Sequence, residues 1–185
     1  MLAVAATAIS IAAGSPPAVL PIGEPLGTLA IPSIGLSVTS VEGSMRMYSG
    51  RNEYLPELQY GPAHYPANAL PWQAGTVAFA GHRVSNTHPF KNLGEVRRGE
   101  VIFLRTRWGI FRYKVVPPPK GHGYVRKGYP ITTSPCALRN SCGVVWKGAG
   151  WFLRPSYNGG ADLVLSACTP KGDSKFRLVI FAKRI

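Results

Sequence analysis

Residues 163–182 read LVLSACTPKGDSKFRLVIFA, and this stretch decides the fold. The apolar run Leu163–Leu165 predicts a strand that ends at a corner of small residues carrying Cys168. The proline and glycine that follow predict a turn, and Phe176–Ala182 predicts a second strand with Arg177 near its start. Such a hairpin places Cys168 and Arg177 at the same end of two neighbouring strands.

A cysteine beside a cation has the chemistry of a nucleophile. A thiol attacks as a thiolate or with the help of a base, and nearby positive charge favours the thiolate. His82 is the candidate base, because it directly follows the apolar run Gly75–Ala80. The competing residues of the same types are His64, His88, His122, Arg83 and Arg126. The alternative is that Cys168 is only a small core residue, which is the commonest role of a lone cysteine.

The composition indicates a single domain built mainly from β-strands. A chain of 185 residues suffices for one sizeable core. Its 21 glycines and 17 prolines disfavour a helical bundle and suit short strands joined by turns. The net charge of +13 raises the possibility of nucleic-acid binding, but the basic residues are scattered and no such motif is present. We therefore expect no nucleic-acid partner, since an anionic cell envelope explains the charge equally well.

Short strands are predicted along the rest of the chain. The expected strands are residues 29–31, 36–41, 76–80, 101–106 and 110–116. We also expect a short helix over 51–60, a Pro-rich loop over 61–74 and a helical turn over 89–96. Residues 120–160 are expected to form a long loop with one possible strand near 122–125, and a loop of that length is usually functional.

Four groups of short motifs stand out along the chain. They are Ile31-Pro32 with Ile34–Leu36, Gly61–Pro66 with Ala69–Pro71, Ala80–Arg83, and Leu165–Cys168 with Pro170 and Arg177. Together they resemble the motifs of sortases, the cysteine transpeptidases of Gram-positive cell surfaces. The match covers roughly residues 28–185 and is most like the actinobacterial class E sortases. It implies a closed β-barrel of about eight strands with one to three short helices. It also implies Cys168 as nucleophile, His82 as acid and base, and Arg177 as oxyanion support.

The resemblance implies cleavage between Thr and Gly of a C-terminal sorting signal on a secreted protein. The protein would then pass through a thioester to an amine of the peptidoglycan precursor. Tyr65 lies in a His-Tyr-Pro segment shared by class E enzymes, which prefer Leu-Ala-x-Thr-Gly over Leu-Pro-x-Thr-Gly. The other candidate substrate-binding residues are Ser166, Ala167, Thr169, Trp146 and Trp151.

The sequence departs from the family at the cysteine motif. Sortases usually carry Thr-Leu-x-Thr-Cys, whereas Val164 and Ala167 replace the two threonines here. This bears on rate and substrate positioning, because the hydroxyl before the cysteine helps to hold substrate or oxyanion in the family. Two alternatives stay open, and Ala167 bears on the second of them. One is a pilin-polymerising sortase, and the other is a basic, envelope-binding β-domain with weak catalysis.

The remaining features concern export and cofactors. Cys136 and Cys142 are disulfide candidates, which would leave Cys168 as the reactive thiol. Residues 2–13 are apolar but too short to span a bilayer, which needs about 20 residues. We interpret residues 1–27 as the remnant of a membrane anchor or signal plus a Pro/Gly linker, before a catalytic domain at 28–185. We expect an N-terminally anchored protein on the extracytoplasmic face of the cell membrane, and no metal or cofactor.

Overall fold

A computed structural model describes residues 14–49, 55–120 and 135–185. Its strands are β1 Pro25–Ile31, β2 Leu36–Glu42, β3 Ala63–His64, β4 Val77–Gly81, β5 Val101–Thr106, β6 Gly109–Val116, β7 Gly143–Trp146, β8 Leu163–Thr169 and β9 Phe176–Arg184. The α-helix is α1, Pro135–Leu138, and 3-10 turns occupy Pro32–Ile34, Met45–Tyr48, Pro56–Leu58, Leu93–Glu95 and Trp151–Leu153.

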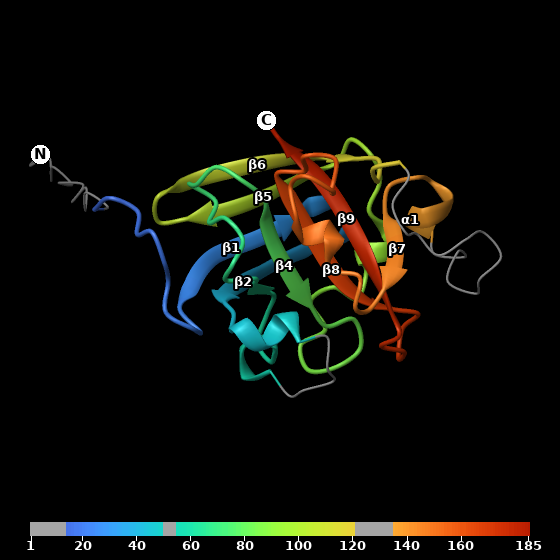
Figure 1. The fold of residues 1–185 in the computed structure, drawn as a ribbon, viewed down its shortest axis with the longest axis horizontal. Coiled ribbons are helices and arrows are strands. Elements are labelled where there is room, and N and C mark those ends of the chain that lie inside the picture. Colours follow the sequence, from blue (N-terminus) through green and yellow to red (C-terminus); the bar gives the residue numbers. More distant parts are fainter. Residues whose placement is uncertain (1–13, 50–54, 121–134) are drawn as a thin grey trace, which may run out of the picture.

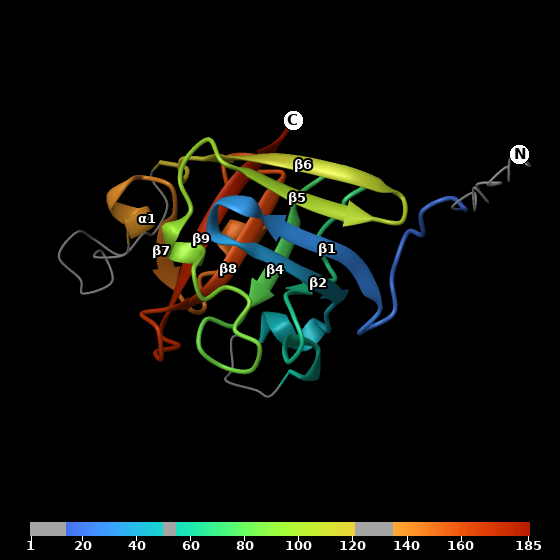
Figure 2. The ribbon, with the colours of Figure 1, turned by 180° about the vertical axis from the view of Figure 1, so that it is seen from behind.

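Eight strands close into a barrel because β9 pairs along both of its edges. The order around the barrel is β6-β5-β1-β2-β3-β4-β8-β9, and β9 then pairs with β6. The first part of β9 pairs with β7 on the same edge, so β7 extends the sheet outside the ring. Figures 1 and 2 show β4, β8 and β9 on one wall, with β1 and β2 opposite. The predicted mainly β, closed-barrel fold is confirmed.

The central strands β4, β8 and β9 are apolar because both of their faces are covered. Along β8, Leu163 and Leu165 point into the barrel core with Phe79 of β4. Val164 lies on the other face, in a second cluster with Phe152 from the segment after β7. A strand covered on both faces has a continuous apolar sequence, as residues 163–165 do.

Several local predictions were wrong. Strand β8 continues through the cysteine to Thr169, beyond the expected corner. The stretch expected to be a long loop contains α1 and β7 in its described part, and the Pro-rich segment contains β3. Of the helix expected over 51–60, the described residues show only the 3-10 turn Pro56–Leu58. The possible strand near 122–125 lies outside the described residues.

Residues 14–24 lie at the end of the barrel where β1 begins (Figure 1). Trp72 Nε1 donates to the Pro17 carbonyl at 2.8 Å, and Gln73 Nε2 donates to the Ala18 carbonyl at 2.8 Å. Part of the expected linker is therefore fixed to the barrel. The apolar residues 2–13 lie outside the described residues, and no helix in the described ranges could cross a membrane.

Candidate active site

Cys168 and Arg177 face each other across the β8–β9 hairpin. The two residues are partners in the antiparallel register, as the sequence predicted. The Arg177 side chain is half-buried, and its Nη1 donates to the carbonyls of Ser174 at 2.8 Å and Phe176 at 3.1 Å. These two bonds hold the guanidinium at the mouth of the turn, on the same cavity wall as Cys168.

His82 reaches the same place from β4. Strands β4 and β8 run parallel, and their last paired residues are Gly81 and Ala167. His82 is the first residue after β4, and Cys168 follows Ala167 on β8, so both lie at the same end of the sheet. A Cβ atom on Gly81 would lie 2.5 Å from the Phe90 ring, which explains why glycine precedes the histidine. Phe90 is fully buried and its backbone N–H donates to the His82 carbonyl at 2.9 Å, which fixes the loop.

The environment of His82 favours the neutral imidazole. Burial of the half-buried ring lowers its pKa, and the positive charge of Arg177 lowers it further. A neutral imidazole can accept the proton of a nearby thiol, which an imidazolium cannot do. The arrangement therefore supplies a base, a thiol and a cation on one surface.

Cys168, His82 and Arg177 line a cavity of about 140 Å³, which lies beside a larger cavity of about 990 Å³. The larger cavity lies between the Pro-rich segment 65–76 and the segment 147–157 after β7. The two cavities share the wall residues Met47, Tyr65, Lys147 and Phe152. A chain of several residues in the larger cavity could therefore reach the thiol in the smaller one.

Tyr65 stands between the two cavities. Its side chain is buried, its ring contacts the Tyr48 ring edge-on with centroids 5.2 Å apart, and its hydroxyl lies 3.4 Å from Ser166 Oγ. Burial raises the pKa of Tyr65, while the Ser166 hydrogen bond and the charge of Arg177 act in the opposite direction. The phenol thus stays protonated at neutral pH and can donate a hydrogen bond into the cavity.

His64, a rival for the role of base, lies behind Tyr65 in a buried pair. Its Nδ1 is 2.9 Å from Glu42 Oε2, and its Nε2 is 3.0 Å from the Ala69 carbonyl. Both side chains are almost fully buried, at 0% and 3% exposed. The pair ties the segment that carries Tyr65 to β2, and the ring does not line either cavity. His88 is exposed in a turn, while His122 and Arg126 lie outside the described residues.

Two polar side chains that the sequence reasoning missed hold the walls of the larger cavity. Asn158 is buried and bonds to Thr76 Oγ1 at 3.0 Å and to the Phe152 carbonyl at 3.1 Å. Asn68 Nδ2 donates to the Leu153 carbonyl at 2.7 Å and so joins the two walls. An asparagine in a glycine-containing segment is typical of any turn, so the sequence held no signal for these roles.

The other candidate substrate-binding residues separate into two groups. Ser166 and Ala167 line the smaller cavity, and Trp151 lines the larger one while stacking on Phe181. Trp146 is 52% exposed, contacts Phe176 and lines neither of these two cavities, so its role in substrate binding stays a prediction.

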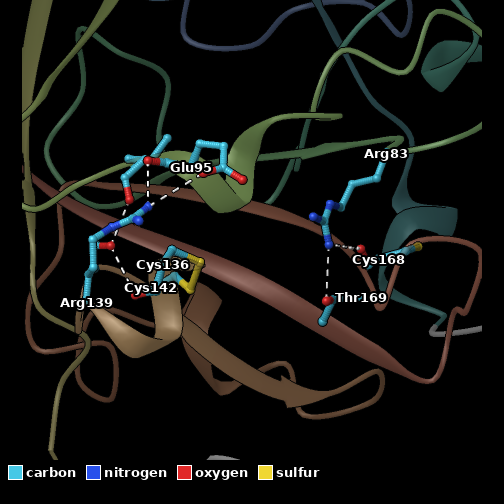
Figure 3. The surroundings of a disulfide bond; sticks show 9 residues. Arg83, Glu95, Cys136, Arg139, Cys142, Cys168 and Thr169 are labelled. Carbon is cyan, nitrogen blue, oxygen red and sulfur yellow. Dashed lines mark hydrogen bonds and ion pairs between the residues drawn. A yellow bond between two sulfur atoms is a disulfide. The ribbon is translucent and has the colours of Figure 1, made fainter. Parts of the chain in front are cut away.

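Thr169 also lines neither of these two cavities. It is buried, and its hydroxyl accepts a hydrogen bond from Arg83 Nη1 at 3.1 Å instead of lining a cavity (Figure 3). The sequence assigned it to substrate because it neighbours the cysteine. The strand alternation instead turns it away from the cavity that Cys168 lines.

Cys136 of α1 and Cys142, the residue before β7, form a disulfide with Cα atoms 5.3 Å apart (Figure 3). Cys168 is the free cysteine. Ser141 lies within the bridged loop, and its hydroxyl donates to the Val96 carbonyl at 2.7 Å, which attaches the loop to the barrel. Within the described ranges, no three His, Cys, Asp or Glu side chains gather as a metal site requires.

Comparisons with known proteins point in one direction. A family model described as the sortase domain matches residues 29–185. Sortase D of Bacillus subtilis (strain 168) is 29% identical over 94 residues, which is 51% of this chain and 41% of that protein. The aligned segment therefore spans less than half of this relative.

Solved structures of three kinds of sortase share the fold. A Clostridium perfringens sortase D5 transpeptidase gives a TM-score of 0.63 at 23% identity, covering 90% of this chain and 82% of that one. Streptococcus agalactiae sortase C1 gives 0.63 at 22%, covering 90% and 70%. A lid mutant of Corynebacterium diphtheriae sortase A gives 0.60 at 21%, covering 85% and 68%.

Proposed function

The chain belongs to the sortase family of cysteine transpeptidases, and we propose that it joins secreted proteins to the cell wall. In this proposal it cleaves a C-terminal sorting signal between Thr and Gly and transfers the protein to an amine of the peptidoglycan precursor. The observation that carries the proposal is the convergence of Cys168, His82 and Arg177 on one cavity, from three different strand ends.

The first half of the reaction forms a thioester. His82 takes the thiol proton, and the Cys168 sulfur attacks the carbonyl carbon of the threonine. Arginine has five N–H donors, and Nη1 of Arg177 supplies the two that bind the turn carbonyls. The other donors stabilise the oxyanion of the tetrahedral intermediate. The C–N bond then breaks, His82 gives its proton to the leaving glycine amine, and the acyl group stays on sulfur.

The second half transfers the acyl group. An incoming amine loses a proton to His82 and attacks the thioester carbonyl, and Arg177 again stabilises the oxyanion. The C–S bond breaks, and the sulfur recovers its proton from His82. Water attacking in place of the amine would give hydrolysis, so an acceptor held near the thiol is what makes the enzyme a transferase.

The larger cavity is the proposed place for the signal residues that precede the scissile bond. It adjoins the thiol through a neck walled by Tyr65 and Phe152, and its apolar side chains include Trp151. Because Tyr65 is buried and held by Ser166 and Tyr48, its ring limits the width of this neck. We assign to it the class E preference for alanine over the bulkier proline in the second signal position.

The proposed location is the extracytoplasmic face of the cell membrane, with residues 1–27 as the tether. The net charge of +13 suits an anionic envelope, and a disulfide is typical of exported proteins. The partners in this proposal are secreted proteins that carry the sorting signal and the amine of the cell-wall precursor.

The proposal is tested by incubating the protein with Leu-Ala-x-Thr-Gly or Leu-Pro-x-Thr-Gly peptides and an amine, and by identifying the products by mass spectrometry. We expect cleavage between Thr and Gly with an amine adduct, faster for the alanine peptide, and no product with Cys168→Ala. Tyr65→Leu should reduce the preference for alanine. Products that form only with a lysine-bearing pilin peptide as acceptor would favour the pilin-polymerising alternative. Binding without cleavage by the folded protein would favour the envelope-binding domain.

A further inference from the structure

Arg83 is buried directly behind the proposed nucleophile. Its side chain is 8% exposed although it carries a permanent charge. Nη1 donates to the backbone carbonyl of Cys168 at 3.2 Å and to the hydroxyl of Thr169 at 3.1 Å (Figure 3). The residue next to the proposed base is thus bonded to the peptide unit of the proposed nucleophile.

This link begins where the sheet ends. The ladder between β4 and β8 stops at the pair Gly81 and Ala167, so it does not fix the two residues that follow. His82 leaves β4 at that point, and β8 continues to the cysteine on pairing with β9 alone. The Arg83 hydrogen bonds join the two segments just beyond the end of the ladder. They connect the strand end that bears the thiol to the loop that bears the imidazole.

Burial of the Arg83 guanidinium lowers the stability of the fold, so a role in the site would explain why this residue is there. Burial lowers the pKa of Arg83, and the nearby Cys168 and Glu95 oppose that shift. Its Nε is buried without a hydrogen-bond partner among the described residues. A buried cation with an unsatisfied donor is a net burden on stability. An apolar residue would fill the same space at lower cost.

We propose that Arg83 is a positioning residue that holds Cys168 at the correct distance and orientation from His82. It acts through the Cys168 carbonyl and the Thr169 hydroxyl, not through the reacting atoms. The inference rests on the proposed function, because it assumes that Cys168 and His82 react together. Misplacing a reacting group by about 1 Å can cost about 100-fold in rate. Two hydrogen bonds that fix the position of Cys168 can therefore have a large effect on kcat.

Three variants separate the contributions of the two Arg83 hydrogen bonds and of the Arg83 charge. Arg83→Met removes both hydrogen bonds and the charge but keeps the aliphatic stem, Arg83→Lys keeps the charge, and Thr169→Val removes one acceptor. Arg139→Met is the matched control, because Arg139 also donates to a backbone carbonyl, that of Glu95 at 2.8 Å, but lines neither cavity (Figure 3).

Two readouts are needed. The first is kcat and KM for cleavage of the sorting peptide. The second is the rate at which iodoacetamide alkylates the protein as a function of pH, which reports on Cys168 because the other two cysteines form the disulfide. Alkylation needs no sorting peptide, so it tests Arg83 even where the peptide is not cleaved. The titratable or charged side chains around this thiol are His82, Arg83, Arg177, Tyr65, Arg46 and Lys147.

For Arg83→Met we expect kcat to fall at least about tenfold with KM nearly unchanged. We also expect alkylation at neutral pH to slow, because Cys168 is no longer held beside His82 and a buried cation is lost. Arg83→Lys should recover most of the alkylation profile and part of kcat, and Thr169→Val should lose less of kcat than Arg83→Met.

A folded Arg83→Met protein with the kcat and alkylation profile of the Arg139→Met control would overturn the proposal, even with a lower melting temperature. If Arg83→Met does not fold, wild-type behaviour of both Arg83→Lys and Thr169→Val would overturn it equally. Absence of cleavage by the wild type would refute the proposed function alone.

Discussion

Replacing Asn158 by alanine should weaken both the fold and the substrate cavity. The Asn158 side chain is 1% exposed and makes three hydrogen bonds. Two are donated to Thr76 Oγ1 and the Phe152 carbonyl, and the third is accepted from the Ala161 backbone N–H at 2.9 Å. These bonds hold the segment between β7 and β8 against the start of β4. Phe152 is a wall of both cavities, so the same change reaches the site.

The expected loss follows from the three bonds. Each contributes about 1 kcal/mol net, and their partners would be left buried, so Asn158→Ala should cost about 3 kcal/mol of unfolding free energy. For a domain of this size, about 1 kcal/mol corresponds to roughly 2–4 °C, which gives a fall of roughly 6–12 °C in Tm. Because Phe152 loses its backbone anchor, KM for the sorting peptide should rise more than kcat falls.

Urea and thermal unfolding measure the first effect, and steady-state kinetics measures the second. Ser156→Ala is the control, since Ser156 lies exposed in the same segment. A loss below about 1 kcal/mol would mean that the three bonds are replaced by water, and would refute the reasoning. An unchanged KM in a destabilised variant would refute the link between Asn158 and the cavity.

Three further changes test other parts of the structure. Gly81→Ala places a methyl 2.5 Å from the Phe90 ring and should lower kcat by displacing His82, so normal steady-state kinetics would contradict the steric account. Arg177→Gln should raise the His82 pKa but leave it below its ordinary 6.5, because burial is the larger cause; an unchanged NMR titration would contradict this. Reducing the Cys136–Cys142 disulfide should cost about 2 kcal/mol in urea unfolding, given its sequence separation of 6, and no loss would exclude a stabilising role.

The sequence was sufficient where chemistry and periodicity coincide. The apolar runs at β8 and β9, with a turn between them, predicted a hairpin that aligns Cys168 with Arg177, and the structure has that register. The parallel neighbour β4 was identified by its apolar run, which also selected His82 among four histidines. The barrel itself followed from the family resemblance, because strand composition alone does not specify closure.

The remainder depends on tertiary contacts that a linear pattern does not contain. The sequence predicted that strand β8 ends after Leu165, because the small residues that follow are typical of a turn. In the structure, pairing with β9 extends β8 to Thr169. The sequence predicted that Thr169 binds substrate, whereas in the structure its hydroxyl accepts a hydrogen bond from the buried Arg83. Strand β7 was missed because its four residues lie in a Gly-rich region and are stabilised by pairing with β9 and by the disulfide loop.

The central claim is that Cys168 carries the acyl group, and intact-protein mass spectrometry tests it most directly. The protein would be mixed with an excess of the sorting peptide without an amine acceptor. The reaction would be quenched in acid and the intact protein mass measured. We expect an added mass equal to the peptide fragment ending in threonine, attached to Cys168 and released by hydroxylamine. We expect no such adduct in Cys168→Ala. Peptide cleavage that continues in Cys168→Ala, or that proceeds with no covalent adduct, would contradict this claim.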